Sequence, residues 1–236
     1  MNRGQVIVVE GIIGAGKSSF SKELASALGE GTLYQQEPDE KNNANPYLAS
    51  FYNDSSRWAY TMQTHLLQMR YKMHLNAQWH SMTTGNFSVL DRSYFGDTAF
   101  ANLQLEMGDM TQDEFDTYQS IYHAMTASVL LPTFCIHLNV RPSIAQSRIV
   151  ARMEKQTGRK CESAIELQYL ESLRVHEDNV VNALDKQGVR VLSIDWNEDR
   201  SDPLLRRDMV LAMAEYIKNY DTPIHNNLLD LHRRTV

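Results

Sequence analysis

Residues 6–20 carry a pattern of residue types that suits the binding of phosphate groups. Gly11, Gly16, Lys17 and Ser18 match G-x-x-x-x-G-K-S, between a run of β-branched residues and a stretch typical of a helix. Glycines let backbone N–H groups turn toward phosphate oxygens, and the helix N-terminus adds its positive dipole end. The lysine neutralises phosphate charge, and the serine hydroxyl ligates Mg²⁺. We therefore predict a nucleoside triphosphate site that contains Gly11, Gly14, Ala15, Gly16, Lys17, Ser18 and Ser19. The alternative is a glycine-rich turn that matches by chance.

Charged residues gather at three other places in the chain. These are "QEP" at 36–38, "DRS" at 91–93, and a basic group formed by Arg148, Arg152, Arg159 and Lys160. Phosphoryl transfer needs a carboxylate near the acceptor, a carboxylate near the metal, and cations around the transferred group. The three groups together therefore indicate a phosphotransferase, although the glycine-rich motif alone does not name the acceptor.

The elements that must position these residues alternate between short apolar strands and longer helices. We predict strands at 5–10, 32–37, 87–91, 133–140 and 189–195. Helices are predicted at 18–28, 56–83, 94–107, 112–129, 142–153, 163–186 and 203–218. This order predicts an α/β fold, a parallel five-stranded sheet flanked by helices on both faces, in a single domain over 1–236. Ligands of such a sheet bind at the carboxyl ends of its strands, where the charged groups fall.

Composition narrows the class of protein further. Hydrophobic residues make up 42% of the chain, which is enough for a full core, and no apolar run approaches the length needed to cross a membrane. The formal net charge of −6 argues against a nucleic-acid polymer as a partner. Cys135 and Cys161 form no metal-ligand or redox motif, and no secretory signal is visible, so we expect a soluble, cytoplasmic protein.

Several motifs in a fixed order extend this interpretation. They are "GIIGAGKSS", "EP" at 37–38, "NPYL" at 45–48, "FY-D" at 51–54, "RWAYTMQ" at 57–63, "DRS" with Asp97, "EMGDM" at 106–110 and "YLESLRVHED" at 169–178. In this combination the chain resembles the deoxynucleoside kinase family, especially its bacterial deoxyadenosine and deoxyguanosine kinase branch, from about residue 5 to 200. The resemblance implies a P-loop nucleoside/nucleotide-kinase fold with an arginine-bearing lid, ATP as donor, Mg²⁺, a deoxynucleoside acceptor and a homodimer.

The predicted catalytic residues are Glu37, Arg92 and Lys17, and the resemblance implies the roles of the first two and a metal-binding role for Asp91. Glu37 would be the general base that accepts the proton of the 5′-hydroxyl group. Arg92 would hold the 5′-oxygen and the incoming phosphate, and Asp91 would orient Mg²⁺ together with Ser18. Two simpler alternatives remain open: Glu37 could be a strand-end carboxylate paired with a lysine, and "DRS" could cap the helix that follows it.

A second group of residues would recognise the nucleobase. Gln63 would make a two-pronged contact, and Arg70 lies two turns along the same helical face. Arg70 and Asp97 together offer donors and an acceptor for exocyclic groups, so we expect purine deoxynucleosides or deoxycytidine to be preferred over thymidine. The alternative is a structural ion pair between Arg70 and Asp97.

The remaining implied contacts concern the sugar, the base faces and the donor phosphates. Met62 and Phe100 would sandwich the base, unless they are ordinary core residues, and Tyr52 and Glu162 would grip the 3′-hydroxyl group. The lid, at about 152–163, would place Arg152 and Arg159 on the phosphates. It departs from the family pattern, because "RIVARMEKQTGRKCE" is longer and has Thr157 where an arginine is expected. Residues 221–236 are expected to form a C-terminal tail.

Two rival functions fit part of this pattern. A nucleoside monophosphate kinase such as thymidylate kinase would want an extra arginine after the "EP" segment, where "DEKNNANPY" offers only Lys41. A non-catalytic nucleotide-sensing module would need the glycine-rich motif, but not Glu37, Arg92 and the lid cations together.

Overall fold

The computed structural model describes residues 4–38, 45–155, 165–198 and 203–220. Five parallel strands form one sheet in the order β2-β3-β1-β4-β5. The strands are β1 (Val6–Glu10), β2 (Leu33–Gln35), β3 (Ser88–Asp91), β4 (Phe134–Asn139) and β5 (Arg190–Asp195). The helices are α1 (Lys17–Leu28), α2 (Leu48–Asn53), α3 (Ser55–Thr84), α4 (Tyr94–Glu106), α5 (Gln112–Thr126), α6 (Pro142–Lys155), α7 (Leu167–Lys186) and α8 (Pro203–Asn219). The predicted parallel five-stranded sheet is confirmed.

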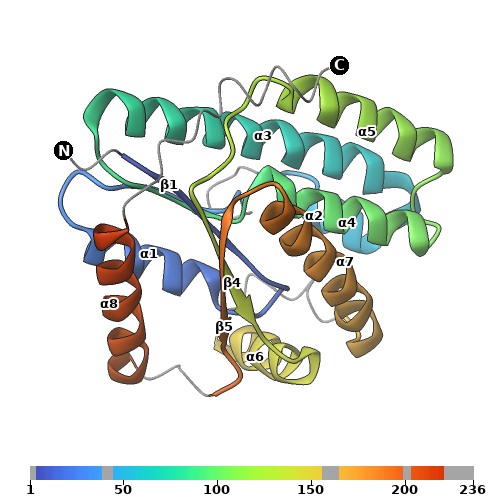
Figure 1. Ribbon diagram of the computed structural model, residues 1–236. Helices are drawn as coiled ribbons and strands as arrows, with labels where there is room; N and C mark the ends of the chain where they lie inside the picture. The colour runs from blue at the N-terminus through green and yellow to red at the C-terminus, as the bar shows by residue number, and fades with distance from the viewer. Residues whose placement is uncertain (1–3, 39–44, 156–164, 199–202, 221–236) are drawn as a thin grey trace.

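Helices cover both faces of the sheet, as its continuous apolar strands require (Figure 1). In β1, Ile7 and Val9 belong to the core cluster that contains α1 and α8 residues, whereas Val6 and Val8 belong to the cluster that contains α3 and α4 residues. Successive side chains of a strand point to opposite faces, so the central strand is buried on both sides. The pairing register then sets Val9 beside Asp91 and Glu10 beside His137 at one edge of the sheet.

The elements differ from the predicted ones mainly between β2 and α3. Strand β2 ends at Gln35, so Glu37 lies in the segment after the strand rather than within it. Helix α2 is not among the predicted helices, because its six residues are too few for a helical period to show in the sequence. The side chain of Asp54 separates α2 from α3 by accepting a hydrogen bond from the Arg57 N–H (3.2 Å).

Two predicted segments cannot be compared with the structure. The predicted lid, 152–163, begins in the last turn of α6, and its residues 156–163 lie outside the described ranges, as does the tail at 221–236.

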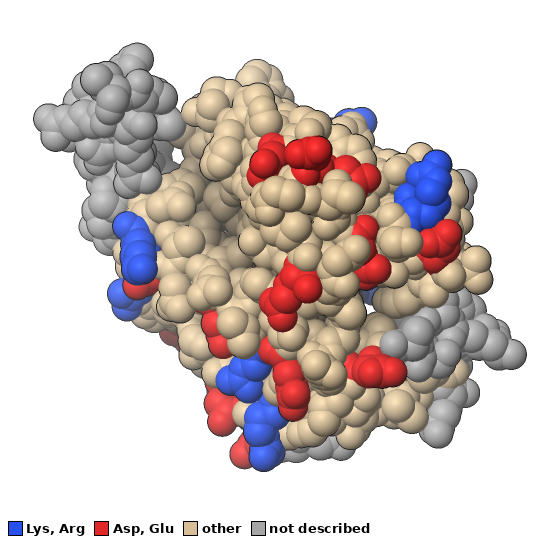
Figure 2. Space-filling model, turned by 90° about the vertical axis from the view of Figure 1, so that its right-hand side faces the viewer, with Lys and Arg blue, Asp and Glu red and all other residues tan. Residues whose placement is uncertain are grey.

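No helix among the described residues is long and apolar enough to cross a membrane. The face on the right-hand side of Figure 1 carries more acidic than basic side chains (Figure 2), in keeping with a net charge of −6. Such a face repels polyanions.

The packing of α1 against the sheet yields a stability prediction. Leu24 is fully buried in the cluster shared by α1 and α8, so Leu24→Ala should lower the free energy of unfolding by about 2–5 kcal/mol through lost burial and a residual cavity. The matched control is Leu211→Ala on α8, where the side chain is 46% exposed and a change within about 0.5 kcal/mol is expected. Urea unfolding measures both, and equal effects of the two substitutions would contradict this packing.

Candidate active site

The glycine-rich loop connects β1 to α1 and lies against α6. Gly14 has φ 81°, and a Cβ atom there would lie 2.5 Å from the carbonyl oxygen of Ala145, so only glycine fits. Gly16, with φ 95°, is the N-cap of α1 and has no side chain that could cover the first N–H groups of the helix. These backbone donors, together with the helix dipole, make the loop suited to bind phosphate.

Lys17 lies buried beneath this loop. Its Nζ atom donates hydrogen bonds to the carbonyl oxygens of Gly11 (2.9 Å) and Ile12 (3.1 Å). Burial, with a smaller contribution from Arg92, lowers the pKa of Lys17 to about 8 against the opposing effect of nearby carboxylates. The lysine is therefore mostly protonated at neutral pH, and it loses its charge as the pH rises through about 8.

Glu37 is held by two arginines that come from different elements. Its Oε1 atom accepts hydrogen bonds from Nη2 of Arg70 (2.7 Å) and Nε of Arg92 (3.0 Å). Burial raises the pKa of Glu37, but Arg92, Arg70 and Lys17 outweigh it and lower the pKa to about 2. Its side chain is still 30% exposed. Glu37 is thus an ionised carboxylate that a ligand can reach.

Arg92 connects the other parts of the site. It follows β3 in the left-handed conformation (φ 66°) and is buried, with its backbone N–H bonded to the carbonyl oxygen of Val9 (3.1 Å). Its Nη2 atom donates to the carbonyl oxygen of Gly11 (2.9 Å), and its Nη1 atom lies 3.6 Å from Oε2 of Glu177. The guanidinium also lies 4.6 Å from the ring centre of Phe100. Arg92 therefore has a fixed position between the glycine-rich loop and Glu37.

The carboxylate of Asp91 is a candidate metal ligand. It is fully buried at the end of β3, and neither of its oxygens has a hydrogen-bond partner among the residues that the structure describes. Burial raises its pKa and Glu37 adds to this, whereas Lys17 and the Ser18 hydroxyl lower it. Buried carboxylate oxygens without partners, close to an exposed serine hydroxyl, suit a hard cation such as Mg²⁺. No group of three or more His, Cys, Asp or Glu residues that could hold a metal occurs within the described ranges.

The residues predicted to recognise the base form a second buried polar group. Nη1 of Arg70 donates to Oδ1 of Asp97, and Oδ2 of Asp97 has no partner among the described residues. Burial raises the pKa of Asp97 to about 7 although Arg70 opposes the shift. Gln63 is 1% exposed, and neither atom of its amide has a hydrogen-bond partner in the described part of the chain. Buried amide groups without partners are costly, so Gln63 fits a position that a polar ligand satisfies.

Other predicted contact residues lie in the surrounding core. Tyr52 is half-buried on α2, with its ring centre 5.5 Å from that of Phe51. Met62 is buried in the same cluster as Phe51, and Phe100 is half-buried beneath the guanidinium of Arg92. The structure therefore brings Phe100 to the Glu37–Arg92 centre, while Met62 also has the core packing that was its alternative reading.

The basic residues of α6 have unequal positions. Arg148 donates to the carbonyl oxygens of Ala15 (3.3 Å) and Trp196 (2.8 Å), which ties the glycine-rich loop to the segment after β5. Arg152 follows one turn later and is half-buried. Arg159, Lys160 and Glu162 lie outside the described residues.

Two further acidic residues lie in the described part of the site and are not predicted from the sequence. Glu177 of α7 is buried, and its Oε1 atom accepts a hydrogen bond from the Gly11 N–H (2.7 Å). Glu10 is buried at the end of β1, where its Oε1 atom accepts from the Ser93 N–H (2.8 Å). Burial, and then Glu177, raises the pKa of Glu10 to about 8. The available signal was a carboxylate that ends an apolar strand directly before the glycine-rich loop.

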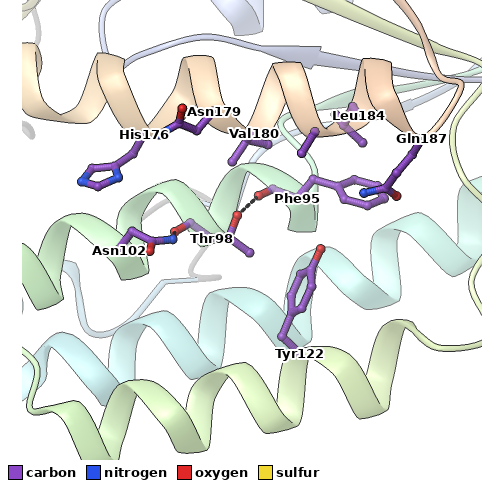
Figure 3. A pocket seen from close by; sticks show the side chains of 10 residues that line it. Phe95, Thr98, Asn102, Tyr122, His176, Asn179, Val180, Leu184 and Gln187 are labelled. Carbon is purple, nitrogen blue, oxygen red and sulfur yellow. Dashed lines mark hydrogen bonds between the residues drawn. The ribbon is translucent and has the colours of Figure 1, made fainter.

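A pocket of about 260 Å³ lies away from this centre, between α4, α5 and α7 (Figure 3). Its lining on α4 comes from Phe95, Thr98 and Asn102, which share one face of the helix. Asp97 points to a different face of the same helix and is buried against Arg70. The pocket is therefore separate from the Glu37–Arg92 centre.

Comparison with known proteins shows which family this chain resembles. The deoxynucleoside kinase family matches residues 7–218. Deoxyguanosine kinase of Dictyostelium discoideum is 32% identical over 196 residues, which cover 83% of this chain and 65% of that protein. Deoxyadenosine/deoxycytidine kinase of Bacillus subtilis (strain 168) is 30% identical over 194 residues, covering 82% of this chain and 84% of the relative.

Solved structures show the same fold. A deoxyadenosine kinase from M. mycoides, determined with the products dCMP and a flexible dCDP bound, has a TM-score of 0.72 at 24% identity. The match covers 89% of this chain and 98% of that one. The family match extends from β1 to α8 and includes every element of the site described above, so the chain belongs to the deoxynucleoside kinase family.

Proposed function

We propose that the protein transfers the γ-phosphoryl group of ATP to the 5′-hydroxyl group of a deoxynucleoside, as a step of nucleotide salvage. One observation carries this proposal: an ionised, partly exposed Glu37 shares Arg92 with the carbonyl group of Gly11 in the phosphate-binding loop. A carboxylate and a guanidinium are thereby placed between a phosphate site and the polar group formed by Arg70 and Asp97. Phosphoryl transfer depends mainly on such positioning and charge neutralisation.

In this mechanism each residue has a distinct task. Glu37 accepts the proton of the 5′-hydroxyl group, and Arg92 neutralises charge that develops between the acceptor oxygen and the phosphorus. Lys17 exchanges its carbonyl partners for the β- and γ-phosphates, because an ionised acceptor forms stronger bonds with an ammonium group. Asp91 and Ser18 would hold Mg²⁺, which when bound neutralises phosphate charge; the unpartnered buried oxygens of Asp91 and the nearby exposed hydroxyl of Ser18 support this assignment.

The acceptor is proposed to carry an amine-bearing base. Gln63, Arg70 and Asp97 offer donors and acceptors that suit adenine, guanine or cytosine better than thymine. The relatives named above act on deoxyguanosine, deoxyadenosine or deoxycytidine, and the M. mycoides enzyme has been determined with dATP and with dCTP bound. Met62 and Phe100 would contact the base faces, and Tyr52 with Glu162 the sugar.

The donor side is proposed to use the basic residues of α6 and the segment after it. Arg148 is engaged with backbone carbonyl oxygens, so Arg152 and Arg159 remain the proposed phosphate contacts of the lid.

We also propose that the protein acts in the cytoplasm, where its free, buried Cys135 stays reduced, and forms a homodimer as the resemblance implies. Exposed large apolar side chains such as Val175 on α7 and Met107 after α4 are compatible with a partner subunit.

Two rival functions are less well supported. A nucleoside monophosphate kinase needs a cation for the acceptor's phosphate, but Arg70 and Arg92 are both paired with carboxylates. A nucleotide sensor does not need an ionised Glu37 next to Arg92. The unpartnered buried amide of Gln63 fits a nucleobase in the acceptor site of either kinase, so it does not separate these two.

Initial rates with the four natural deoxynucleosides, their ribose counterparts and the matching monophosphates, at fixed Mg-ATP, test the proposed function. ADP release should be fastest with deoxynucleosides that carry amine-bearing bases, because these bases form hydrogen bonds with Gln63 and Asp97. A faster rate with a monophosphate would favour the rival kinase. ADP release that does not depend on any acceptor would contradict the proposal.

Glu37→Gln tests the general base. The substitution keeps an acceptor for Arg70 and Arg92 but removes the charge, so kcat should fall about 10²-fold or more while nucleoside binding changes little. Glu23→Gln is the matched control, since Glu23 pairs with Arg206 on the α1–α8 side of the sheet. Steady-state rates and equilibrium nucleoside binding measure both variants, and a normal kcat in Glu37→Gln would remove this residue from the role.

The titration of Lys17 should appear in the pH dependence of ATP use. Its pKa is lowered to about 8, so the ammonium form dominates below pH 8 and is lost as the pH rises through that value. Because kcat/KM reports the free enzyme, kcat/KM for ATP should fall above pH 8. With ATP already saturating, kcat should keep its value to higher pH, because bound phosphate stabilises the ammonium form. Profiles from pH 6.5 to 9.5 with deoxyadenosine decide this, and a flat kcat/KM profile would be inconsistent with it.

A further inference from the structure

One guanidinium group in the site contacts two carboxylates that have different proposed tasks. Nη2 of Arg70 lies 2.7 Å from Oε1 of Glu37, and Nη1 of the same residue donates to Oδ1 of Asp97. The side chain of Arg70 is only 4% exposed, so its guanidinium makes both contacts in a buried position and not at the protein surface. The resemblance that assigns Arg70 and Asp97 to the base does not anticipate the contact with Glu37.

We propose that Arg70 couples recognition of the nucleobase to the activity of Glu37. A base that bonds to Arg70 and Asp97 draws the guanidinium away from Glu37, which leaves that carboxylate a stronger acceptor for the proton of the 5′-hydroxyl group. This inference rests on the proposed function and adds a device that makes catalysis depend on the base.

The contacts of the two arginines indicate which of them moves. Arg92 has partners on three other sides: the carbonyl group of Gly11, the carboxylate of Glu177 and the ring of Phe100. Arg70 has one other charged partner, Asp97, and its Nε atom has no hydrogen-bond partner among the described residues. Arg70 is therefore the arginine that can exchange a contact with Glu37 for acceptor atoms of a base.

The charges around Glu37 explain why the exchange matters. Glu37 faces the cations Arg92, Arg70 and Lys17 and is also near the acids Asp91 and Asp97. Two guanidinium groups share its Oε1 atom, and a carboxylate held in this way is a weak base. General bases work best when their pKa lies nearer the operating pH, so withdrawal of one cation improves proton transfer.

The coupling has a distinct kinetic consequence. If the base supplied only uniform binding energy, equal in the ground state and the transition state, its removal would raise KM and leave kcat unchanged. If the base must draw Arg70 from Glu37, its removal lowers kcat even when the acceptor is saturating.

The experiment uses an acceptor that lacks a base, 1,2-dideoxyribose, beside deoxyadenosine at saturating Mg-ATP. In the wild-type protein we expect kcat for the abasic acceptor to be lower by about tenfold or more, a part of the roughly 10²–10⁴ that a general base supplies. Free adenine added in trans should raise kcat for the abasic acceptor, because it can occupy the base site and bond to Arg70 and Asp97.

Arg70→Met tests the residue itself. With the guanidinium removed, Glu37 is released whether or not a base is present, so the ratio of kcat values for the two acceptors should approach one and adenine should have no effect. Arg57→Met on the exposed side of α3 is the matched control and should keep the wild-type ratio. Circular dichroism checks that both variants fold. If Arg70→Met does not fold, the wild-type measurements with and without adenine decide the question.

Two outcomes would overturn the coupling while leaving the proposed function intact. One is a kcat for the abasic acceptor equal to that for deoxyadenosine, with the difference confined to KM. The other is an Arg70→Met variant that keeps the wild-type ratio and the response to adenine. Failure of the proposed function itself would look different, because the wild-type protein would then phosphorylate none of deoxyadenosine, deoxyguanosine and deoxycytidine.

Discussion

The site depends on the burial of one charged side chain, Arg92. A guanidinium that is 1% exposed must be paired, since an unpaired buried charge costs several kcal/mol. Its partners come from four parts of the chain: Glu37 after β2, Gly11 in the phosphate-binding loop, Glu177 in α7 and Phe100 in α4. Pairing this one guanidinium therefore brings the donor side and the acceptor side of the site together. The left-handed backbone conformation of Arg92 further fixes its position.

Around Arg92 the buried and partly buried acids outnumber the cations, and protonation as well as pairing reduces this excess of negative charge. The cations are Lys17, Arg70 and Arg92, and the acids are Glu10, Glu37, Asp91, Asp97 and Glu177. Burial raises the pKa of Glu10 to about 8, so this acid is mostly neutral at pH 7. Asp97, with a pKa raised to about 7, is only partly ionised. The excess of acids is therefore smaller than their number suggests, and Asp91 keeps oxygens for a cation.

The sequence predicts the sheet and the phosphate-binding loop well because both depend on neighbours in the chain. An apolar strand buried on two faces has a continuous run such as 6–9, and the loop has fixed glycine spacing. The contacts of Arg70 with Glu37, and of Glu177 with Gly11, join residues 33 and 166 positions apart. A carboxylate inside a helical pattern looks like a surface residue, so only the packing of α7 reveals the role of Glu177.

The division of the site between elements suggests how selectivity could change without loss of chemistry. The proposed donor contacts lie on the loop after β1 and on α1 and α6, whereas Gln63, Arg70 and Asp97 lie on α3 and α4. Glu37 contacts Arg70 on the base side, Arg92 contacts Gly11 on the donor side, and the hydrogen bond between Glu37 and Arg92 joins the two groups. A substitution on α3 or α4 can therefore alter which base is accepted while the phosphate-binding loop keeps its geometry, but any change at Arg70 reaches Glu37 as well. Under the proposed roles of these residues, Arg70 would therefore link base selectivity to catalytic rate.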